Sequence, residues 1–306
     1  MAASECSAKE IFLSDVHVNT PFLRTSITDV AITRFRIMRP AISSDPNLMQ
    51  EIRPTFADED GDLSPLRKDV KHEDCDYITI EHHLSTAMED IGLQVWRGTL
   101  LLCDYIVHHE DRFDGCTMLE LGAGLGLCSI IVGRVAKRVF CTDIGDIVLQ
   151  KCKDNIAKNS HLFKYGNDAV VVREFDWLKN GILAGESDFC WTKEDQDALK
   201  DTSVLLAADV IYDDLLTDAF VESILTLFNK AKAEIVLYLT IEKRLNFTLR
   251  DLAVTSPAYD YFLCRIEKLE TVEQKLKARQ LRTDFPKYLQ YERVKELVIS
   301  LLLWRI

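Results

Sequence analysis

The chain has 306 residues, of which 47% are hydrophobic, and it carries a formal net charge of −12. This apolar content is enough to fill a sizeable core, so a chain disordered throughout is excluded. The acidic balance argues against nucleic-acid binding through a general basic field and favours a basic protein as partner. We find no signal-peptide pattern and no apolar run of about 20 residues, which predicts an intracellular protein without a membrane segment.

Cysteine usage points to a reducing compartment. The chain has nine cysteines but no pair with C-x-x-C spacing. Four of them fall within apolar patterns, namely Cys103, Cys128, Cys141 and Cys152. This predicts buried thiols rather than a disulfide framework or a zinc site, and we expect no metal.

Residues 1–75 differ from the rest of the chain, and we predict a partly flexible N-terminal extension over 1–75 followed by one domain over 76–306. Residues 28–37 show strand-like alternation, but four of the seven prolines then interrupt the pattern. The acidic run 58–62 lacks the glycine position and the final glutamate of an EF-hand, which favours a solvated loop over a calcium site.

From Tyr77 onwards strand and helix patterns alternate, which predicts an α/β fold with a seven-stranded, mainly parallel sheet and helices on both faces. A polar insertion spans 178–202, with a helix beginning near Thr192 at a capping box formed with Asp195. Two final strands should come from 275–306, the last of them around 298–304. We expect other helices at 92–107, 127–136 and 259–269, and two more whose apolar faces fall within 148–156 and 220–228, the second beginning near Asp213. The other strands are expected at 117–121, 139–142, 169–174, 204–208 and 235–240.

The most informative feature is a glycine-rich loop after the first of these strands. Residues 118–127 read MLELGAGLGL, which places glycine at 122, 124 and 126. Glycine is needed where the backbone turns tightly and lies close to a ligand. The next strand ends in Asp143, 21 residues beyond Gly122, and an acid there can accept hydrogen bonds from ribose hydroxyls. Together these features predict an adenosine-containing cofactor.

The details of the loop decide between cofactors. A dinucleotide fingerprint, G-x-G-x-x-G, aims its amides at a pyrophosphate, but Leu127 takes the place of its last glycine here. The loop reads E-x-G-x-G-x-G instead, and Glu120 would repel a pyrophosphate while suiting a cofactor with an ammonium and a sulfonium group. This pattern resembles the class I S-adenosylmethionine (SAM)-dependent methyltransferases, where the acid helps to hold the methionine end.

The carboxyl ends of four strands carry residues suited to a site. Ligands of an open parallel sheet bind outside these ends, which are Glu120 with the glycine loop, Asp143, Asp176-Trp177 and Ala208-Asp209. Because the carboxyl ends of parallel strands meet at one edge, we expect these groups to converge there.

Three motifs sharpen the resemblance. Asp209-Val210-Ile211-Tyr212 matches the D-x-x-Y signature of the seven-β-strand protein-lysine methyltransferases, Trp96 matches their V-W motif, and Asp176-Trp177 resembles their aromatic contact to adenine. Segments 13–17, 58–63 and 242–250 extend the likeness to one member of that family over most of the chain. Two departures are Leu125, where relatives often have a hydroxyl, and the missing glycine after Trp177.

The resemblance implies transfer of a methyl group from SAM to a lysine of a basic, nuclear protein associated with DNA or RNA, with the cytoplasm as a second compartment. It predicts Asp209 and Tyr212 as the catalytic residues. The predicted cofactor-binding residues are Trp96, Glu120, Gly122, Ala123, Gly124, Gly126, Asp143, Trp177 and Ala208.

The same chemistry can be argued from the residues. Methyl transfer is an in-line displacement, so catalysis comes from alignment and from matching the change in charge. Lysine, with a pKa near 10.4, is neutral only about once in ~10³ molecules at pH 7. The site must attract the ammonium, let it lose a proton and hold the amine in line. Asp209 would orient the amine, and Tyr212 would line its channel or donate its hydroxyl.

Alternatives remain at the level of sequence. Asp209 could cap a helix that begins near Asp213, while Trp96, Trp177 and Tyr212 could be core residues. The rival functions are a SAM-dependent methyltransferase of a small molecule or nucleic acid, a nicotinamide oxidoreductase, and a non-catalytic interaction module that keeps the cofactor fold.

Overall fold

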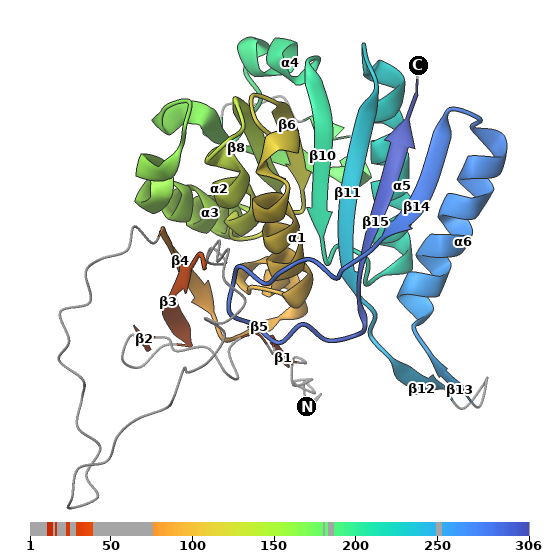
Figure 1. Ribbon diagram of the computed structural model, residues 1–306, viewed down its shortest axis with the longest axis horizontal. Coiled ribbons are helices and arrows are strands. Elements are labelled where there is room, and N and C mark those ends of the chain that lie inside the picture. The colour runs from red at the N-terminus through yellow and green to blue at the C-terminus, as the bar shows by residue number, and fades with distance from the viewer. Residues whose placement is uncertain are drawn as a thin grey trace, which may run out of the picture.

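The computed structural model describes residues 11–14, 16, 23–24, 29–38, 76–179, 181–182, 187–248 and 253–305 (Figure 1). An eight-stranded sheet lies at its centre, with strand order β14-β15-β11-β10-β6-β7-β8-β9. The strands are β6 (Thr117–Leu121), β7 (Arg138–Asp143), β8 (Val170–Asp176), β9 (Gly181–Ile182), β10 (Thr202–Ala208), β11 (Ile235–Glu242), β14 (Leu276–Leu281) and β15 (Leu297–Trp304).

The sheet confirms the predicted mainly parallel α/β architecture. Strands β8, β7, β6, β10 and β11 run parallel to one another, and β15 lies antiparallel between β11 and β14. The two-residue strand β9, from the predicted insertion, pairs antiparallel with β8 and extends the expected seven strands to eight. The carboxyl ends of the five parallel strands therefore meet at one edge of the sheet.

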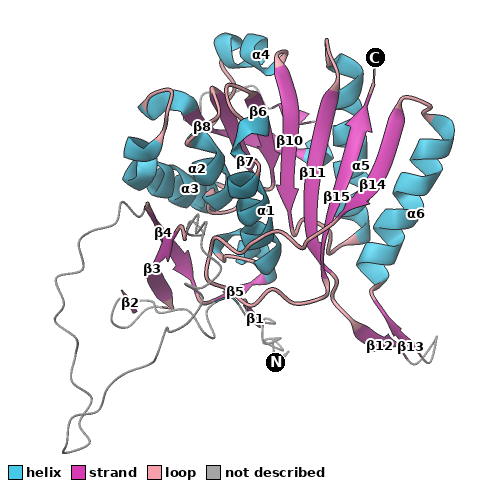
Figure 2. Cartoon of the chain, viewed as in Figure 1, coloured by secondary structure: helices cyan, strands magenta, loops and turns pink. Residues whose placement is uncertain are grey.

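Helices cover both faces of the sheet (Figure 2). Successive strand residues point to opposite faces, so Met118 packs in the cluster that contains Leu100 and Ile130, whereas Leu119 packs with Phe220 and Phe262. The first cluster draws on α1, α2 and α3, and the second on α5 and α6. The helices are α1 (Arg97–His108), α2 (Leu127–Gly133), α3 (Asp146–Asn159), α4 (Lys193–Leu199), α5 (Asp214–Lys230) and α6 (Pro257–Val272).

The predicted helix at 92–107 is wrong at its start. A 3₁₀ helix, η3 (Met88–Leu93), precedes an extended stretch, and α1 begins only at Arg97, with Trp96 as its N-cap residue at φ −114° and ψ 154°. The N–H of Gly98 donates to the Asp209 carboxylate at 2.6 Å. A distant side chain therefore satisfies the first turn, which the local spacing of apolar residues could not reveal.

The other predicted elements agree with the structure to within a few residues. Helix α2 ends at Gly133 rather than at 136, where the next N–H groups turn to carbonyls three residues back. Strand β8 continues to Asp176. Helix α4 begins as predicted, since Thr192 and Asp195 form both hydrogen bonds of a capping box.

The described part of the N-terminal region is joined to the sheet domain. Strand β3 (Val30–Arg36) pairs antiparallel with β4 (Tyr77–His83), and β2 (Leu23–Arg24) pairs with β3. From α3, the amide of Asn155 bonds the N–H and C=O of Glu81 at 2.9 and 3.0 Å, and Asn159 does the same at Thr79. The two amides thus bond backbone groups of β4 as a neighbouring strand would, and they join this small sheet to α3. The acidic run 58–62 lies outside the described residues.

A buried carboxylate on α1 holds the loop between β14 and β15 in place. Figure 1 shows this loop passing in front of α1. Asp104 is fully buried and accepts the N–H groups of Tyr288 and Leu289, both at 2.8 Å. Its other oxygen accepts from Arg293 at 2.5 Å. This Asp104–Arg293 clamp holds the last part of the chain on the domain.

Cys103, Cys128, Cys141 and Cys152 are buried free thiols, as their apolar settings predict. The two pairs pack closely, with Sγ atoms 3.6 Å apart for Cys103 and Cys128 and 3.3 Å apart for Cys141 and Cys152. None of the helices that the structure describes is long and apolar enough to cross a membrane.

Candidate active site

A cavity of about 690 Å³ opens at the edge where the parallel strands end. Its walls come from the segments that follow β6, β7, β8, β10 and β11, from η3, and from strand β1 (Ile11–Leu13). Most of the predicted site residues line it, namely Trp96, Gly122, Ala123, Gly124, Asp143, Trp177, Ala208, Asp209 and Tyr212. The expected convergence of the strand ends is confirmed for these residues.

Two glycines keep the loop after β6 open toward the cavity. Gly122 and Gly124 have φ of 68° and 53°, a backbone conformation that residues with a side chain rarely adopt. A Cβ at Gly122 would lie 2.6 Å from Val210, and one at Gly124 would lie 2.8 Å from the carbonyl oxygen of Gly92. The loop therefore needs glycine here both for its conformation and for its close contact with neighbouring segments.

Asp143, at the end of β7, is held by the loop that it faces. Its carboxylate accepts the N–H of Gly124 at 2.6 Å and that of Ile144 at 2.8 Å. Burial raises the pKa of Asp143, and these two N–H groups oppose that shift. A carboxylate has about four acceptor positions, so Asp143 can still accept hydrogen bonds from ribose hydroxyls in the cavity.

Trp177 follows β8 and lies beside the glycine loop. Two of its ring carbons would be 3.4 Å from a Cβ at Gly122, and its ring packs on Phe220 with centroids 5.1 Å apart. Its Nε1 is buried and has no hydrogen-bond partner among the described residues. The Trp177 ring lines the cavity and its N–H is available as a donor, so this side chain is suited to contact a heteroaromatic base. The predicted contact with adenine requires such a side chain.

Asp209 is strained and tightly held. It is the single described non-glycine residue with positive φ, at 54°, a conformation that costs about 1–3 kcal/mol and is concentrated at functional sites. Its oxygens accept the N–H of Gly98 at 2.6 Å and that of Glu242 at 2.7 Å. Burial raises its pKa, opposed by the Glu242 N–H, the charge of Arg244 and the Gly98 N–H.

The alternative role of Asp209 as a cap for the following helix is wrong. Asp213 caps α5 and accepts the N–H of Leu216 at 2.8 Å. Asp209 instead bonds the first turn of α1, so it fixes the helix that carries Trp96 at its end. A Cβ on Gly98 would lie 2.6 Å from the Asp209 carboxylate, which makes Gly98 a requirement of this contact.

The two remaining predicted aromatic residues, Trp96 and Tyr212, also line the cavity. Tyr212 is 42% exposed, so it is not an ordinary core residue, and burial of its hydroxyl raises its pKa. Trp96 donates from Nε1 to the carbonyl of Ile91 at 3.3 Å, and its ring faces the guanidinium of Arg244 at 5.1 Å.

Two predicted cofactor residues do not line the cavity. Glu120 is 1% exposed and bonds the hydroxyl of Ser129 behind the loop. Burial raises the pKa of Glu120 to about 7, against the hydrogen bonds from Ser129. Gly126, at φ 81°, packs over Cys152. Glu120 therefore lies behind the loop without lining the cavity, and Gly126 contributes to the shape of the loop.

The sequence analysis missed several lining residues. Glu242 is the last residue of the fifth parallel strand, which was expected to end at 240, and Arg244 follows two residues later. An analysis of that strand end as well would have found both residues. Phe12 and Leu13 come from β1, which pairs with β5 (Ser85–Ala87). No local signal predicts a wall supplied from so far along the chain.

The charge of the lining is mainly negative. Five acids line the cavity against one base, Arg244; the acids are Glu89, Asp143, Asp176, Asp209 and Glu242. Such a surface attracts cations and repels a pyrophosphate. Among the residues that the structure describes, no cluster of His, Cys, Asp or Glu could hold a metal ion.

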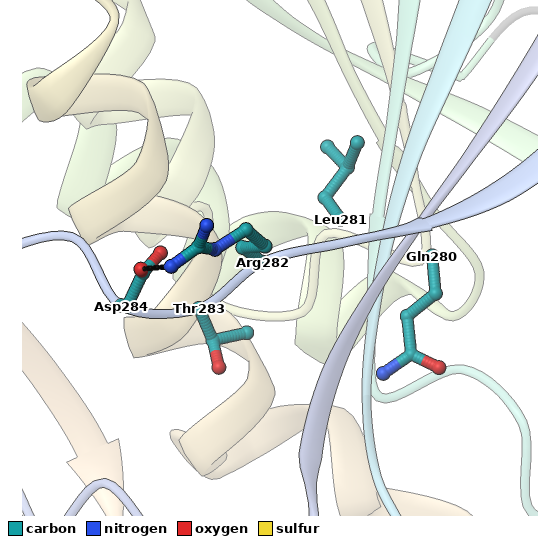
Figure 3. A pocket seen from close by; sticks show the side chains of 5 residues that line it. All are labelled: Gln280, Leu281, Arg282, Thr283 and Asp284. Atoms are coloured by element: carbon teal, nitrogen blue, oxygen red, sulfur yellow. Dashed lines mark hydrogen bonds and ion pairs between the residues drawn. The ribbon is translucent and has the colours of Figure 1, made fainter.

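A second hollow lies farther along the same edge of the sheet, beyond β11 and β15 (Figure 3). It is lined only by Gln280–Asp284, as the chain leaves β14, and Arg282 pairs with Asp284 across it. It contains none of the predicted site residues and is far more open, so we do not assign the chemistry to it.

Comparison with known proteins supports the interpretation of this cavity as the site of a methyltransferase. A family described as lysine methyltransferase matches residues 73–253. Methyltransferase-like protein 22 of Mus musculus is 42% identical over 282 residues, covering 88% of this chain and 70% of the mouse protein. The chain belongs to the lysine methyltransferase family. The human methyltransferase-like protein 22 is also 42% identical, over 280 residues, with 88% of this chain and 68% of the human protein covered.

More distant similarities were also found. Protein N-lysine methyltransferase METTL21A of Mus musculus is 30% identical over 139 residues, covering 45% of this chain and 54% of that protein. Among solved structures, an O-methyltransferase from Bacillus cereus has a TM-score of 0.41 and 16% identity, with 70% of this chain and 83% of that chain covered.

The chain is thus a SAM-dependent protein-lysine methyltransferase with a class I fold, as its sequence predicts. The cavity fits SAM: Asp143 has acceptors left for ribose, Trp177 offers a ring, and the acidic lining suits a cationic cofactor. When bound, SAM supplies the methyl group as an electrophile.

Proposed function

We propose that this enzyme methylates a lysine of a basic, nuclear protein associated with DNA or RNA, without binding nucleic acid directly. The observation that carries the proposal is the lining of the cavity, where five acids face one base. The net charge of −12 supports the same choice of partner, since a negative surface attracts a basic protein and repels a nucleic acid. The nuclear part rests on the family resemblance of the sequence motifs.

In this proposal the lysine ammonium enters toward Asp209. The raised pKa of that carboxyl favours its accepting a proton from the ammonium, which leaves the amine lone pair free to attack. The two backbone N–H groups on Asp209 keep its oxygens in place as the charge changes. Tyr212, half-exposed beside this path, lines the channel and keeps its own proton because its pKa is raised.

The test is transfer of radiolabelled methyl from SAM into nuclear and cytosolic extracts, with Asp209→Asn protein alongside. We expect one or a few labelled bands in the nuclear extract, resistant to nuclease, with the label recovered as methyl-lysine and absent with the variant. The labelling rate should fall as salt rises. Label lost on nuclease treatment would instead indicate a nucleic-acid substrate, and label confined to cytosolic proteins would contradict the nuclear assignment.

A further inference from the structure

Arg244 is the one cation among the described residues that line the cavity, and two groups hold its guanidinium. The guanidinium carbon lies 5.1 Å from the centre of the Trp96 ring. One nitrogen lies 3.6 Å from a carboxylate oxygen of Glu242. An aromatic face beside a carboxylate is a combination that binds ammonium and guanidinium groups. Trp96 and Glu242 thus form a cation site, and a side chain of the enzyme itself fills it.

The walls of this site are held by more buried contacts than its occupant. Glu242 has only 11% of its side chain exposed, and its other oxygen accepts from Arg97 at 2.9 Å. Trp96 is anchored through Nε1 to the carbonyl of Ile91. Arg244 is 47% exposed and follows the end of β11. A half-exposed ion pair contributes little free energy, so Arg244 can leave without disturbing the walls.

The site adjoins the predicted catalytic carboxylate. The N–H of Glu242 donates directly to Asp209 at 2.7 Å, and Asp209 also bonds the first turn of α1 just after Trp96. A cation held between Trp96 and Glu242 is therefore next to the group that must receive the lysine. We propose that Trp96 and Glu242 form a subsite for the ammonium of the incoming lysine, and that Arg244 occupies it in the free enzyme until the lysine displaces it.

This inference rests on the proposed lysine substrate, but it can be tested without methyl transfer. The probe is Nα-acetyl-lysine methylamide, titrated into the protein bound to S-adenosylhomocysteine, with the norleucine analogue as the uncharged control. The readout is the indole N–H signal of Trp96, one of four tryptophans, assigned with Trp96→Phe. The variant is Arg244→Gln.

A matched control lies next in the chain. Lys243→Gln removes the same charge and also ends a cation–π contact, because Lys243 lies 4.4 Å from the ring centre of Tyr259, outside the cavity lining. We expect Arg244→Gln to bind the lysine probe roughly three- to tenfold more tightly than wild type, with a shift of the Trp96 signal. Lys243→Gln and Arg244→Lys should stay near wild type, and the norleucine analogue should not bind.

Three results would overturn the inference. Equal tightening by Lys243→Gln would mean that general charge, not this subsite, controls binding. Tighter binding without a shift at Trp96 would place the cation elsewhere. Weaker binding of S-adenosylhomocysteine by Arg244→Gln would instead assign Arg244 to the carboxylate of the cofactor. If the probe behaves as expected but extracts take up no methyl-lysine, the substrate proposal fails while the subsite remains.

Discussion

Asp104, in the Asp104–Arg293 clamp, and the two cavity carboxylates Asp143 and Asp209 have similar backbone hydrogen bonds but different roles. Asp104, Asp143 and Asp209 each accept two backbone N–H groups, and burial raises the pKa of all three. Asp104 also has the guanidinium of Arg293 at 2.5 Å. Asp143 and Asp209 face the cavity instead.

This difference separates stability from function within one domain. A buried carboxylate without a counter-charge is costly, and at the clamp the chain supplies its own cation. At the cavity we expect a ligand to supply the partner: neutral ribose hydroxyls that donate hydrogen bonds to Asp143 and, in the proposed function, a lysine ammonium at Asp209. Each set can be disturbed separately, which gives the predictions below.

Breaking the clamp should have the largest effect. Asp104→Ala leaves Arg293, 13% exposed, without its buried partner, so we expect unfolding free energy to fall by about 3–5 kcal/mol. Urea denaturation measures it. The control is Asp218→Ala, which breaks a partly exposed pair with Arg265 and should cost no more than about 1 kcal/mol. If the two variants lost equal free energy of unfolding, the clamp would be no more stabilising than a surface ion pair.

At the cavity, Asp143→Asn should weaken SAM binding. Because the amide keeps only one of the two oxygens that accept the N–H groups of Gly124 and Ile144, the free energy of unfolding is measured alongside. Loss of a charge-assisted hydrogen bond to ribose costs roughly 1.5–3 kcal/mol, a tenfold or greater rise in Kd. Calorimetric titration with SAM gives this value, and Asp188→Asn, an exposed acid paired with Lys153, serves as the control. An unchanged Kd would exclude the ribose role of Asp143.

Glu120 sharpens the comparison because it is buried and its side-chain partners, Ser129 and Cys128, carry no positive charge. Its pKa is about 7 in the folded protein and near 4.5 when unfolded. Below pH 4.5 both states hold the proton. As pH rises to 7, the unfolded state loses its proton first, so stability falls.

At pH 8, Glu120→Gln should therefore have a free energy of unfolding up to about 2–3 kcal/mol higher than wild type. At pH 4.5 the two proteins should be nearly equal in stability. Urea midpoints at both pH values test this. Saturating SAM should reduce the difference, because its positive charges favour ionised Glu120. A variant less stable than wild type at pH 8 would mean that the carboxylate is better solvated than the structure indicates.

Much of the fold and part of the site could be predicted from sequence because the signals are local. The strand–loop–helix of Gly122 and the spacing to Asp143 need only adjacent segments. The start of α1 was mispredicted because its cap, Asp209, lies 111 residues from Gly98. Leu13 was missed for the same reason. It lies in β1, and the N–H of the next residue, Ser14, donates to the side chain of Gln94, 80 residues away. Long-range side-chain contacts leave no local pattern.

The central claim is that Asp209 is kept open for the lysine rather than for stability or for the cofactor. The most direct measurement is methyl transfer by Asp209→Asn at saturating SAM, with SAM affinity and melting temperature recorded on the same protein. We predict a loss of transfer of about a hundredfold or more, with SAM affinity within about twofold, since the charge of Asp209 is not needed to bind ribose. Transfer at the wild-type rate, or an equal loss of SAM affinity, would contradict the claim.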